Sequence, residues 1–297
     1  MKEKWTGAFL TAFGGMCWGI SGSVGQYLFT SEGMDSRWLV PVRLGLAGIV
    51  LLLYCAMRYG KMTIQPWTTK KDAMDLLIYG LLGVSCCQFF YFLTIQNSNA
   101  GTATILQNVS PVLILATECY IAHRKPIKRE IASVVLALIG IWLIATHGTG
   151  ALEVSSLALV SGILSAVCVT IYNCYPKQLL NKYPITLLQG WAFLLGGIVF
   201  SFVFDVFHMH YVPTFTGWLG VAFVVLVGNV LAFTSYMRGV KMIGAEKAIL
   251  YSFFEPLTAA IITVLFMGTP FTFADFIGFV CIFGMLLMIS RKEKKPL

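Results

Sequence analysis

Charged residues are scarce in this chain, and histidine is scarcer still. Of its 297 residues only 11% are Asp, Glu, Lys or Arg and four are histidine, whereas 58% are hydrophobic. A soluble globular domain has about 25% charged and about 45–50% apolar residues. The composition therefore excludes an ordinary soluble protein, and no stretch outside the apolar segments is long enough to form a soluble domain. We predict an integral membrane protein.

Motifs of common enzyme chemistry are also missing. The sequence has no P-loop, no dinucleotide-binding glycine fingerprint, no HExxH and no GxSxG. Its eight cysteines form no CxxC pair and do not alternate with histidine, so no metal site is predicted. The net charge of +8 comes from basic residues in short connections, which indicates membrane topology and not a nucleic-acid partner. We expect no cofactor and no enzymatic activity, with an intramembrane enzyme as the least favoured alternative.

What the sequence does contain is a series of ten apolar segments. They are 7–29, 36–57, 73–96, 100–121, 130–147, 154–175, 184–205, 215–237, 243–266 and 272–290. Most reach the roughly 20 residues that a transmembrane helix needs. The first follows Lys2 and Lys4 but lacks a small-x-small cleavage site, so we expect a retained helix and not a signal peptide. The predicted fold class is an all-α integral membrane protein with ten transmembrane helices.

The basic residues orient these helices. With the N-terminus inside, 19 of the 21 Lys and Arg residues lie at the cytoplasmic side, and only Arg37 and Arg43 do not. Lys and Arg are enriched in cytoplasmic connections of membrane proteins. We therefore predict a multi-pass protein of the plasma membrane with both termini in the cytoplasm.

An internal repeat relates the two halves of the chain. Residues 100–115 align with 245–260 at an offset of 145, which pairs Ala100 with Ala245 and Pro111 with Pro256. We predict two five-helix units, 1–148 and 149–297. An odd number of helices per unit places the second unit upside down, as in many secondary transporters, whose substrate sites lie at interrupted helices near the membrane midplane. Simple duplication in a scaffold protein is the alternative.

The segment 244–266 carries a carboxylate inside the membrane. Glu255 lies about 16 Å beyond Gly244 at the rise of an α-helix, close to the middle of a hydrocarbon layer of about 30 Å. Ionisable residues at that depth usually mark a functional site. Pro256 follows at once and, like Pro111, predicts a helix break. The alternative is a neutral glutamic acid that only ties two helices together.

The chain resembles EamA-type members of the drug/metabolite transporter superfamily. The motifs that carry this resemblance are Trp18-Gly19, Arg43, Ser110-Pro111, Glu255-Pro256 and the glycines of the fifth and tenth segments, Gly140 and Gly284. The acid usual just before the fifth helix is replaced by His123-Arg124-Lys125. The resemblance implies a central cavity lined by helices 1–4 and 6–9, with helices 5 and 10 peripheral, and export of amino acids or other small metabolites.

Polar and aromatic residues at helical spacing form the candidate site. Gln107 and Asn108 share a face of the fourth segment with Thr104 and Glu118, and the face meets either a cavity or another helix. Glu118 either lines the cavity or pairs with the cytoplasmic basic cluster, and Arg43 either binds a substrate carboxylate or pairs with an acid. The predicted substrate-binding residues are Trp18, Arg43, Gln88, Tyr91, Gln107, Asn108, Tyr172, Asn229, Tyr236, Tyr251 and Ser252. For the aromatic ones, helix packing is the alternative.

These observations predict a secondary transporter that moves a small metabolite by alternating access. Amino acids or related amphipathic compounds are the expected substrates, and Glu255 is the candidate proton or cation coupling site. An uncoupled facilitator or channel with the same cavity is the alternative. The expected partners are the small-molecule substrate, the lipid bilayer and protons, with a monomer or homodimer as the assembly. Gly15 and Gly19 form a GxxxG pair that predicts close helix packing.

Overall fold

In a computed structural model of the chain, the described residues are 2–121, 123–146, 148–149, 154–175, 177–209, 211–243, 251, 254–268 and 271–290. Every regular element within these ranges is a helix. In chain order they are α1 (Lys2–Thr30), α2 (Ser36–Tyr59), η1 (Gly60–Trp67), α3 (Lys70–Leu77), η2 (Ile78–Ser85), α4 (Cys86–Asn97), α5 (Ala100–Gln107), α6 (Ser110–Ile121), α7 (Lys128–Thr146), α8 (Ser156–Cys174), α9 (Lys177–Lys182), α10 (Ile185–Val203), η3 (Val206–His208), α11 (Phe215–Phe223), η4 (Val224–Leu231), α12 (Ala232–Ile243), α14 (Phe254–Met267) and α15 (Phe273–Ser290).

Several of these helices are suited to a lipid environment. Within the described residues, six continuous helical stretches are long and apolar enough to cross a membrane. They are Ser36–Trp67, Lys70–Asn97, Ala100–Ile121, Ser156–Cys174, Ile185–Val203 and Phe215–Ile243. This confirms the expectation of an all-helical, multi-pass membrane protein. The ten-helix inverted repeat remains a prediction.

Two of the long stretches change helix type in the middle. The stretch Lys70–Asn97 contains the π-helical segment η2, and Phe215–Ile243 contains the π-helical segment η4, each eight residues long. A π-helix has wider turns than an α-helix and is rare, commonly occurring at functional sites. Neither segment was predicted from the sequence.

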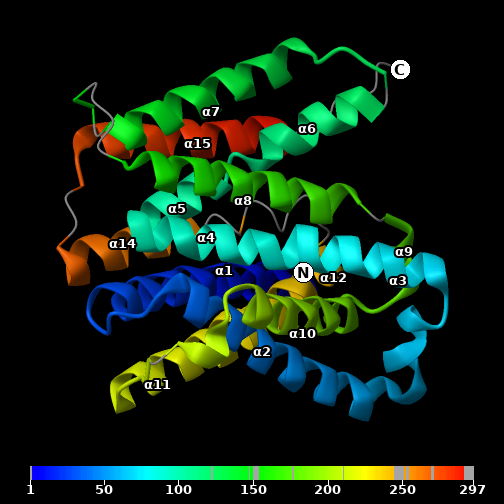
Figure 1. The fold of residues 1–297 in the computed structure, drawn as a ribbon. Coiled ribbons are helices and arrows are strands. Elements are labelled where there is room, and N and C mark those ends of the chain that lie inside the picture. The colour runs from blue at the N-terminus through cyan, green and yellow to red at the C-terminus, as the bar shows by residue number, and fades with distance from the viewer. Residues whose placement is uncertain are drawn as a thin grey trace.

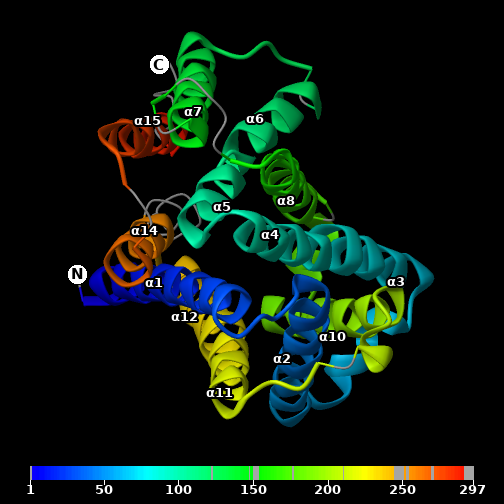
Figure 2. The same ribbon diagram turned by 60° about the vertical axis from the view of Figure 1, so that its left-hand side comes forward.

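The fourth predicted segment is interrupted near its proline. Helix α5 ends at Gln107, and α6 begins at Ser110, directly before Pro111. Proline fits the first turn of a helix because no hydrogen bond is expected from that position. The direction change between α5 and α6 is visible in Figure 2. Pro256 likewise lies in the first turn of α14, and residues 244–250 before it are outside the described part.

The helices form a layered bundle, with most of them roughly parallel in Figure 1. Helix α2 packs against α10, and α7 packs against α15. Helix α1 contacts α12 and α14, and α8 contacts α4, α5 and α6. Figure 2 shows the pair α7 and α15 set to one side of the remaining helices.

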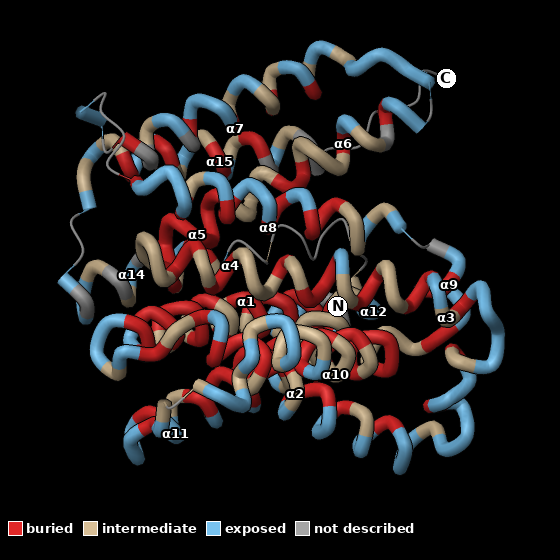
Figure 3. The backbone as a smooth tube through the Cα atoms, viewed as in Figure 1, coloured by how far each residue is buried: buried red, intermediate tan, exposed pale blue. Residues whose placement is uncertain are grey.

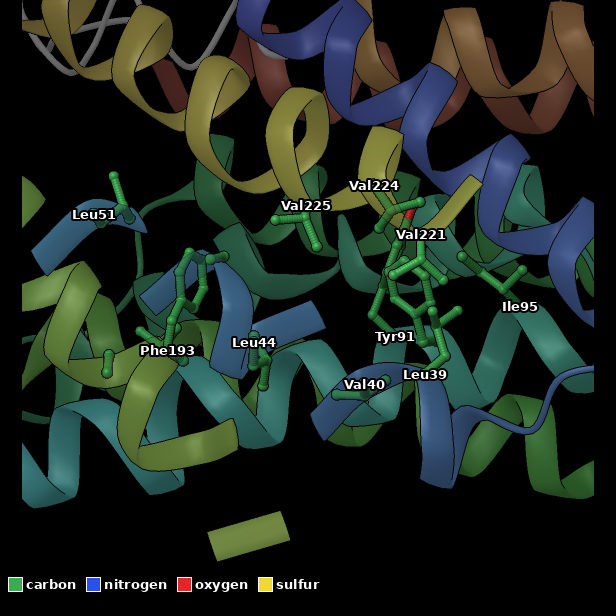
Figure 4. Close-up of a cluster of buried hydrophobic side chains, with 14 of the residues drawn as sticks. Leu39, Val40, Leu44, Leu51, Tyr91, Ile95, Phe193, Val221, Val224 and Val225 are labelled. Atoms are coloured by element: carbon green, nitrogen blue, oxygen red, sulfur yellow. The ribbon is translucent and has the colours of Figure 1, made fainter. Parts of the chain in front are cut away.

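Buried residues concentrate in the middle layer of the bundle. Figure 3 shows buried positions on α1 and α10 and exposed positions on the outer faces of α7 and α11. The main apolar core joins α2, α4, α10 and η4, with Leu44, Phe92 and Phe193 nearly or fully buried. Figure 4 shows that Leu44, Phe193 and Val225 from three of these elements lie in one cluster. This core holds the elements that line the candidate site.

Hydrogen bonds close the end of the bundle where α1 turns into α2. The carboxylate of Glu32 accepts hydrogen bonds from the hydroxyls of Tyr27 (3.2 Å), Thr214 and Thr216 (2.7 Å). These bonds join the α1–α2 turn to the start of α11. The hydroxyls of Thr214 and Thr216 hold the pKa of Glu32 below its ordinary value, because they stabilise the ionised carboxylate.

Two glutamine side chains bind helix starts at the same end. Gln26 accepts a hydrogen bond from the backbone N–H of Ala100 (2.8 Å), and Gln96 accepts one from that of Ser36 (2.9 Å). The first N–H groups of a helix have no partner within the helix, so such side chains satisfy them. The two bonds join α1 to α5 and α4 to α2.

A second polar cluster joins α3 to the α8–α10 connection. Asp72 accepts hydrogen bonds from Lys182 and from the hydroxyl of Tyr183 (2.8 Å). One turn further along, Asp75 accepts a hydrogen bond from the hydroxyl of Tyr175 (2.8 Å). The short helix α9 in this connection was not predicted from the sequence.

Candidate functional site

A cavity of about 390 Å³ lies in the interior of the bundle. This volume falls within the range of about 300–1,000 Å³ found for small-molecule sites. Its walls come from α1, α2, η2, α4, α5, α6, α8, α10, η4, α12 and α14. Helices from both predicted halves of the chain therefore contribute, while α7 and α15 do not.

Most of the residues proposed from the sequence line this cavity. They are Trp18, Arg43, Gln88, Tyr91, Gln107, Asn108, Tyr172, Asn229, Tyr236 and Glu255, together with Pro111. Three proposed residues do not join them. Tyr251 is half-buried and Pro256 is buried, and neither is part of the lining. Ser252 lies outside the described residues.

The carboxylate of Glu255 has no protein partner in the described part of the chain. Its residue is half-buried and lies in the first turn of α14. Helix α1 approaches this turn closely at Gly19, where a Cβ atom would lie 2.5 Å from the backbone oxygen of Glu255. Glycine at position 19 therefore allows α1 to lie directly against the helix that carries the acid.

Close helix packing was predicted at Gly15 and Gly19, and the close contacts of α1 occur at Gly14 and Gly19. Gly19 faces α14, and Gly14, which the pattern did not single out, faces α12. A Cβ atom on Gly14 would lie 2.8 Å from the backbone oxygen of Ala232. Two different glycines thus set the distances of α1 to its two neighbours.

Arg43 is the only basic residue in the described lining, and it is buried, with 2% of its surface exposed. Its Nη2 donates a hydrogen bond to Oε1 of Gln88, and its guanidinium carbon lies 3.8 Å from the centre of the Phe92 ring. Among the described residues no acid forms an ion pair with it, and its Nε has no hydrogen-bond partner. Pairing with an acid was one of the two readings of this residue, and the described structure gives it no support.

The polar residues at the end of α5 are held by hydrogen bonds, one within α5 and others to α4 and α8. Gln107 donates a hydrogen bond from Nε2 to Oγ of Ser165 on α8 (2.8 Å). Asn108 donates to the backbone oxygen of Thr104 (2.7 Å), and the hydroxyls of Thr104 and Tyr91 lie 2.8 Å apart. These contacts fix side chains at the interrupted helix, so the break presents a defined polar surface to the cavity.

Aromatic rings make up much of the remaining wall. The rings of Trp18 and Tyr236 pack with their centroids 5.0 Å apart, and those of Tyr79 and Tyr172 are 6.5 Å apart at 80°. Each pair joins helices from different halves of the chain. The same rings therefore pack against each other and also line the cavity. Helix packing and cavity lining, given as alternatives for these residues, occur together.

Some lining residues were missed from the sequence. Gln189 of α10 accepts a hydrogen bond from the hydroxyl of Tyr79 (3.1 Å), and both line the cavity. A glutamine one turn into an apolar segment was a usable signal, because a buried polar side chain needs a partner. Ser21, Phe193 and Phe233 also contribute, and nothing in their spacing distinguished them from packing residues.

Two further predictions concern Glu118 and the connection before the fifth predicted helix. The side chain of Glu118 lies outside the described residues, so both readings of it stay open. The residues His123-Arg124-Lys125 stand where an acid was expected before the fifth predicted helix. Nearby, Glu130 lies in the first turn of α7. Its carboxylate accepts hydrogen bonds from the backbone N–H of Ile127 (2.8 Å) and from Arg124.

The cavity combines the kinds of group that a small amphipathic molecule would contact. It joins a cationic side chain, a carboxylate, amides and several aromatic rings in an otherwise apolar bundle. No group of three or more His, Cys, Asp or Glu side chains suited to a metal ion occurs within the described ranges. The eight cysteines are free thiols.

Comparison with known proteins gives consistent matches over nearly the full chain. The profile of the EamA-like transporter family matches residues 5–146 and again residues 156–291. The uncharacterized inner membrane transporter YicL of Salmonella typhimurium is 32% identical over 279 residues, which cover 94% of this chain and 93% of that protein. The uncharacterized transporter YetK of Bacillus subtilis is 26% identical over 254 residues, covering 84% and 76% respectively.

A solved crystal structure shows the same overall fold. It superposes with a TM-score of 0.66 at 15% sequence identity, and the match covers 97% of this chain and 96% of the other. At this level of identity the likeness concerns the arrangement of helices and not the contents of the cavity.

Proposed function

The chain belongs to the EamA-like transporter family, and from this premise we propose that it is a proton-coupled secondary transporter of small metabolites. The proposed substrates are amino acids or related amphipathic compounds, and the proposed direction is export across the plasma membrane. The observation that carries the proposal is the interior cavity, which is lined from both halves and in which Glu255 has no partner among the described residues.

An inverted pair of five-helix units is part of this proposal, and the packing supports it. If the halves correspond, α1 matches α8, α2 matches α10, α3–α4 match α11–α12, and α7 matches α15. The contact of α1 with α12 then corresponds to the contact of α8 with α4. The contact of α1 with α14 corresponds to the contacts of α8 with α5 and α6, the two parts of the fourth predicted segment. The remaining pairs, α2 with α10 and α7 with α15, each join a helix to its own counterpart.

Local features repeat at offsets within one residue of that of the sequence repeat. The π-helical segments η2 and η4 begin 146 residues apart, at Ile78 and Val224. In the first turns of α7 and α15, Glu130 and Asp275 accept hydrogen bonds from the backbone N–H three residues earlier, at 2.8 and 2.7 Å. These two acids lie 145 residues apart, the offset of the sequence repeat. Both observations support units 1–148 and 149–297.

The structure corresponds, in this proposal, to a state that faces the cytoplasm. The Glu32 hydrogen bonds close the end where α1 meets α2, which the basic residues assign to the outside. The cavity extends the other way, to Ile185 at the start of α10 and Val240 near the end of α12. Alternating access requires a second state in which this outer closure opens and the cytoplasmic end closes.

Glu255 is proposed to carry the coupling proton. A carboxylate in a membrane interior is costly when charged, so it takes up a proton when the site is closed to water and releases it when water returns. The absence of a protein donor at its carboxylate, within the described residues, leaves the group free to change its protonation state. A site that faces the two sides in turn converts this cycle into transport.

The test is transport by the purified protein in proteoliposomes. A panel of L-amino acids, polyamines and small drugs is measured with and without a pH gradient. A gradient of one unit supplies about 1.4 kcal/mol, enough for about tenfold accumulation at one proton per substrate. Glu255→Gln is expected to abolish gradient-driven accumulation while substrate exchange persists, because glutamine keeps the size but cannot bind a proton.

Glu118→Gln is the matched control, since Glu118 lies on α6 only about one turn from the cytoplasmic basic cluster. It is expected to keep most of the coupling. Unchanged coupling in Glu255→Gln would refute the role of this acid. Counterflow in the wild type that is indifferent to the gradient would instead support the facilitator, and no flux for any compound would refute the proposed function.

A further inference from the structure

Two buried hydrogen-bond donors of the cavity wall have no partner in the described part of the chain. The Nε of Arg43 and the Nδ2 of Asn229 are fully buried and donate a hydrogen bond to no protein acceptor within the described residues. Arg43 is 2% exposed and Asn229 is 3% exposed, and both line the cavity. They lie on α2 and η4, which pack against each other. Buried donors without partners are uncommon in native structures and call for an explanation.

The charge of Arg43 makes the missing partner more significant. Its neighbours supply one neutral acceptor, the Oε1 of Gln88, and the face of the Phe92 ring. Neither cancels a full positive charge, and an ionised group in a membrane interior is normally paired or exposed to a watery cavity. The guanidinium has five N–H donors in a planar fork that matches a carboxylate.

We propose that Arg43 and Asn229 form a subsite for the carboxylate of the transported substrate. This inference rests on the proposed transport function and adds the substrate class. The carboxylate would accept hydrogen bonds from the guanidinium of Arg43 and from the amide of Asn229. Gln88 and Phe92 hold the guanidinium in place from the side of α4.

The charges of the cavity favour a monoanionic group over a phosphate. Arg43 and Glu255 are the only charged side chains in the described lining. A phosphate dianion would meet a single cation and, elsewhere in the same cavity, a carboxylate of the same sign. A carboxylate is matched by one guanidinium. The aromatic rings of Trp18, Tyr172 and Tyr236 supply the apolar wall for the rest of the molecule.

The test compares a carboxylate with an uncharged molecule of the same shape. Equilibrium binding of radiolabelled benzoate and benzamide is measured on the full-length protein in lipid nanodiscs. Wild type is expected to bind benzoate at least tenfold more tightly than benzamide, because hydrogen bonds to a charged group are the stronger ones. Arg43→Gln and Asn229→Ala are expected to lose most of this preference, and Arg43→Lys to keep part of it.

Arg37→Gln is the matched control, because Arg37 lies on the same helix but is exposed and paired with Asp35. It should keep the full preference for benzoate. Equal binding of the two probes by wild type, no binding of benzoate, or a preference that survives in both Arg43→Gln and Asn229→Ala would overturn the subsite.

The melting temperature of each variant shows whether it is folded, and Asn229→Ala tests the subsite even where Arg43→Gln is unfolded. Flux with a pH gradient in wild type is measured separately, so a failure of the subsite is distinguishable from a failure of the transport function.

Discussion

Replacement of Gly19 by alanine tests whether the contact between α1 and α14 is as close as the structure indicates. The added Cβ would lie 2.5 Å from the backbone oxygen of Glu255, 2.9 Å from Cβ of Thr258 and 3.0 Å from the backbone nitrogen of Ala259. Ordinary contacts between heavy atoms are about 3.5 Å, so the two helices must separate by roughly 0.5–1 Å. Two of the three atoms belong to the backbone of α14 and cannot rotate away.

The expected cost follows from two opposing effects. Overpacking of a tight contact destabilises by about 1–3 kcal/mol. Alanine in place of glycine in a helix recovers about 0.4–1 kcal/mol, mainly by restricting the unfolded chain. The net loss is therefore about 0.5–2 kcal/mol, or roughly 1–5 °C in melting temperature for a chain of this size. The displacement also moves Glu255, so gradient-driven flux should fall even where the variant remains folded at the assay temperature.

The assay is thermal melting in detergent together with flux in proteoliposomes. Gly45→Ala is the control, because its Cβ would meet only the Cα of Gly197, at an ordinary 3.9 Å. It is expected to melt at or slightly above the wild-type temperature and to transport normally. If Gly19→Ala matches the wild type in both measurements, α1 and α14 do not approach as closely as described, and the argument for the role of Gly19 fails.

Two further predictions concern topology and the outer closure. Tags at the N-terminus, in the connection 68–71 and at the C-terminus should all be accessible only from the cytoplasm, because 19 of 21 basic residues lie on that side of the predicted topology; an external signal from any one would contradict the inverted repeat. Thr216→Val should lower the melting temperature at neutral pH, because the valine cannot donate to the carboxylate of Glu32. Since the pKa of Glu32 is lowered in the folded protein, this stabilisation is present above the ordinary carboxyl pKa of about 4 and is lost as the pH falls below it. The difference between variant and wild type should therefore shrink on acidification, and a difference that is constant with pH would show that Glu32 is not the acceptor that matters.

Much of the candidate site could be predicted because its residues violate the apolar pattern around them. Glu255 and Arg43 are ionisable groups within apolar segments, and a charge at such depth needs a cavity or a partner whatever the arrangement of the helices. Pro111 marked the interruption between α5 and α6 for a similar reason, since proline lacks the backbone donor that a continuous helix uses.

Other features depend on which helices become neighbours, and periodicity does not give this information. The partner of Arg43 is Gln88, 45 residues away, whereas the sequence suggested a substrate carboxylate or an acid. Tyr251 has the same spacing relative to Glu255 as a lining residue would have, yet it is not part of the lining. The packing partner of Gly14 also follows from the helix arrangement alone. Spacing shows which residues share a face of a helix, but it does not show which helix or cavity that face contacts.

The π-helical segments η2 and η4 also bear on the history of the chain. A π-helix holds more residues per turn than an α-helix, so it arises when a residue is inserted into an existing helix without shifting the helix on either side. Well under 1% of residues in proteins are π-helical. Two segments of eight residues that begin 146 positions apart are therefore poorly explained by separate insertions. Under the proposed duplication, the insertion had already occurred in a single five-helix ancestor. In the proposed topology the two units lie in opposite orientations, so that ancestor would have inserted into the membrane both ways.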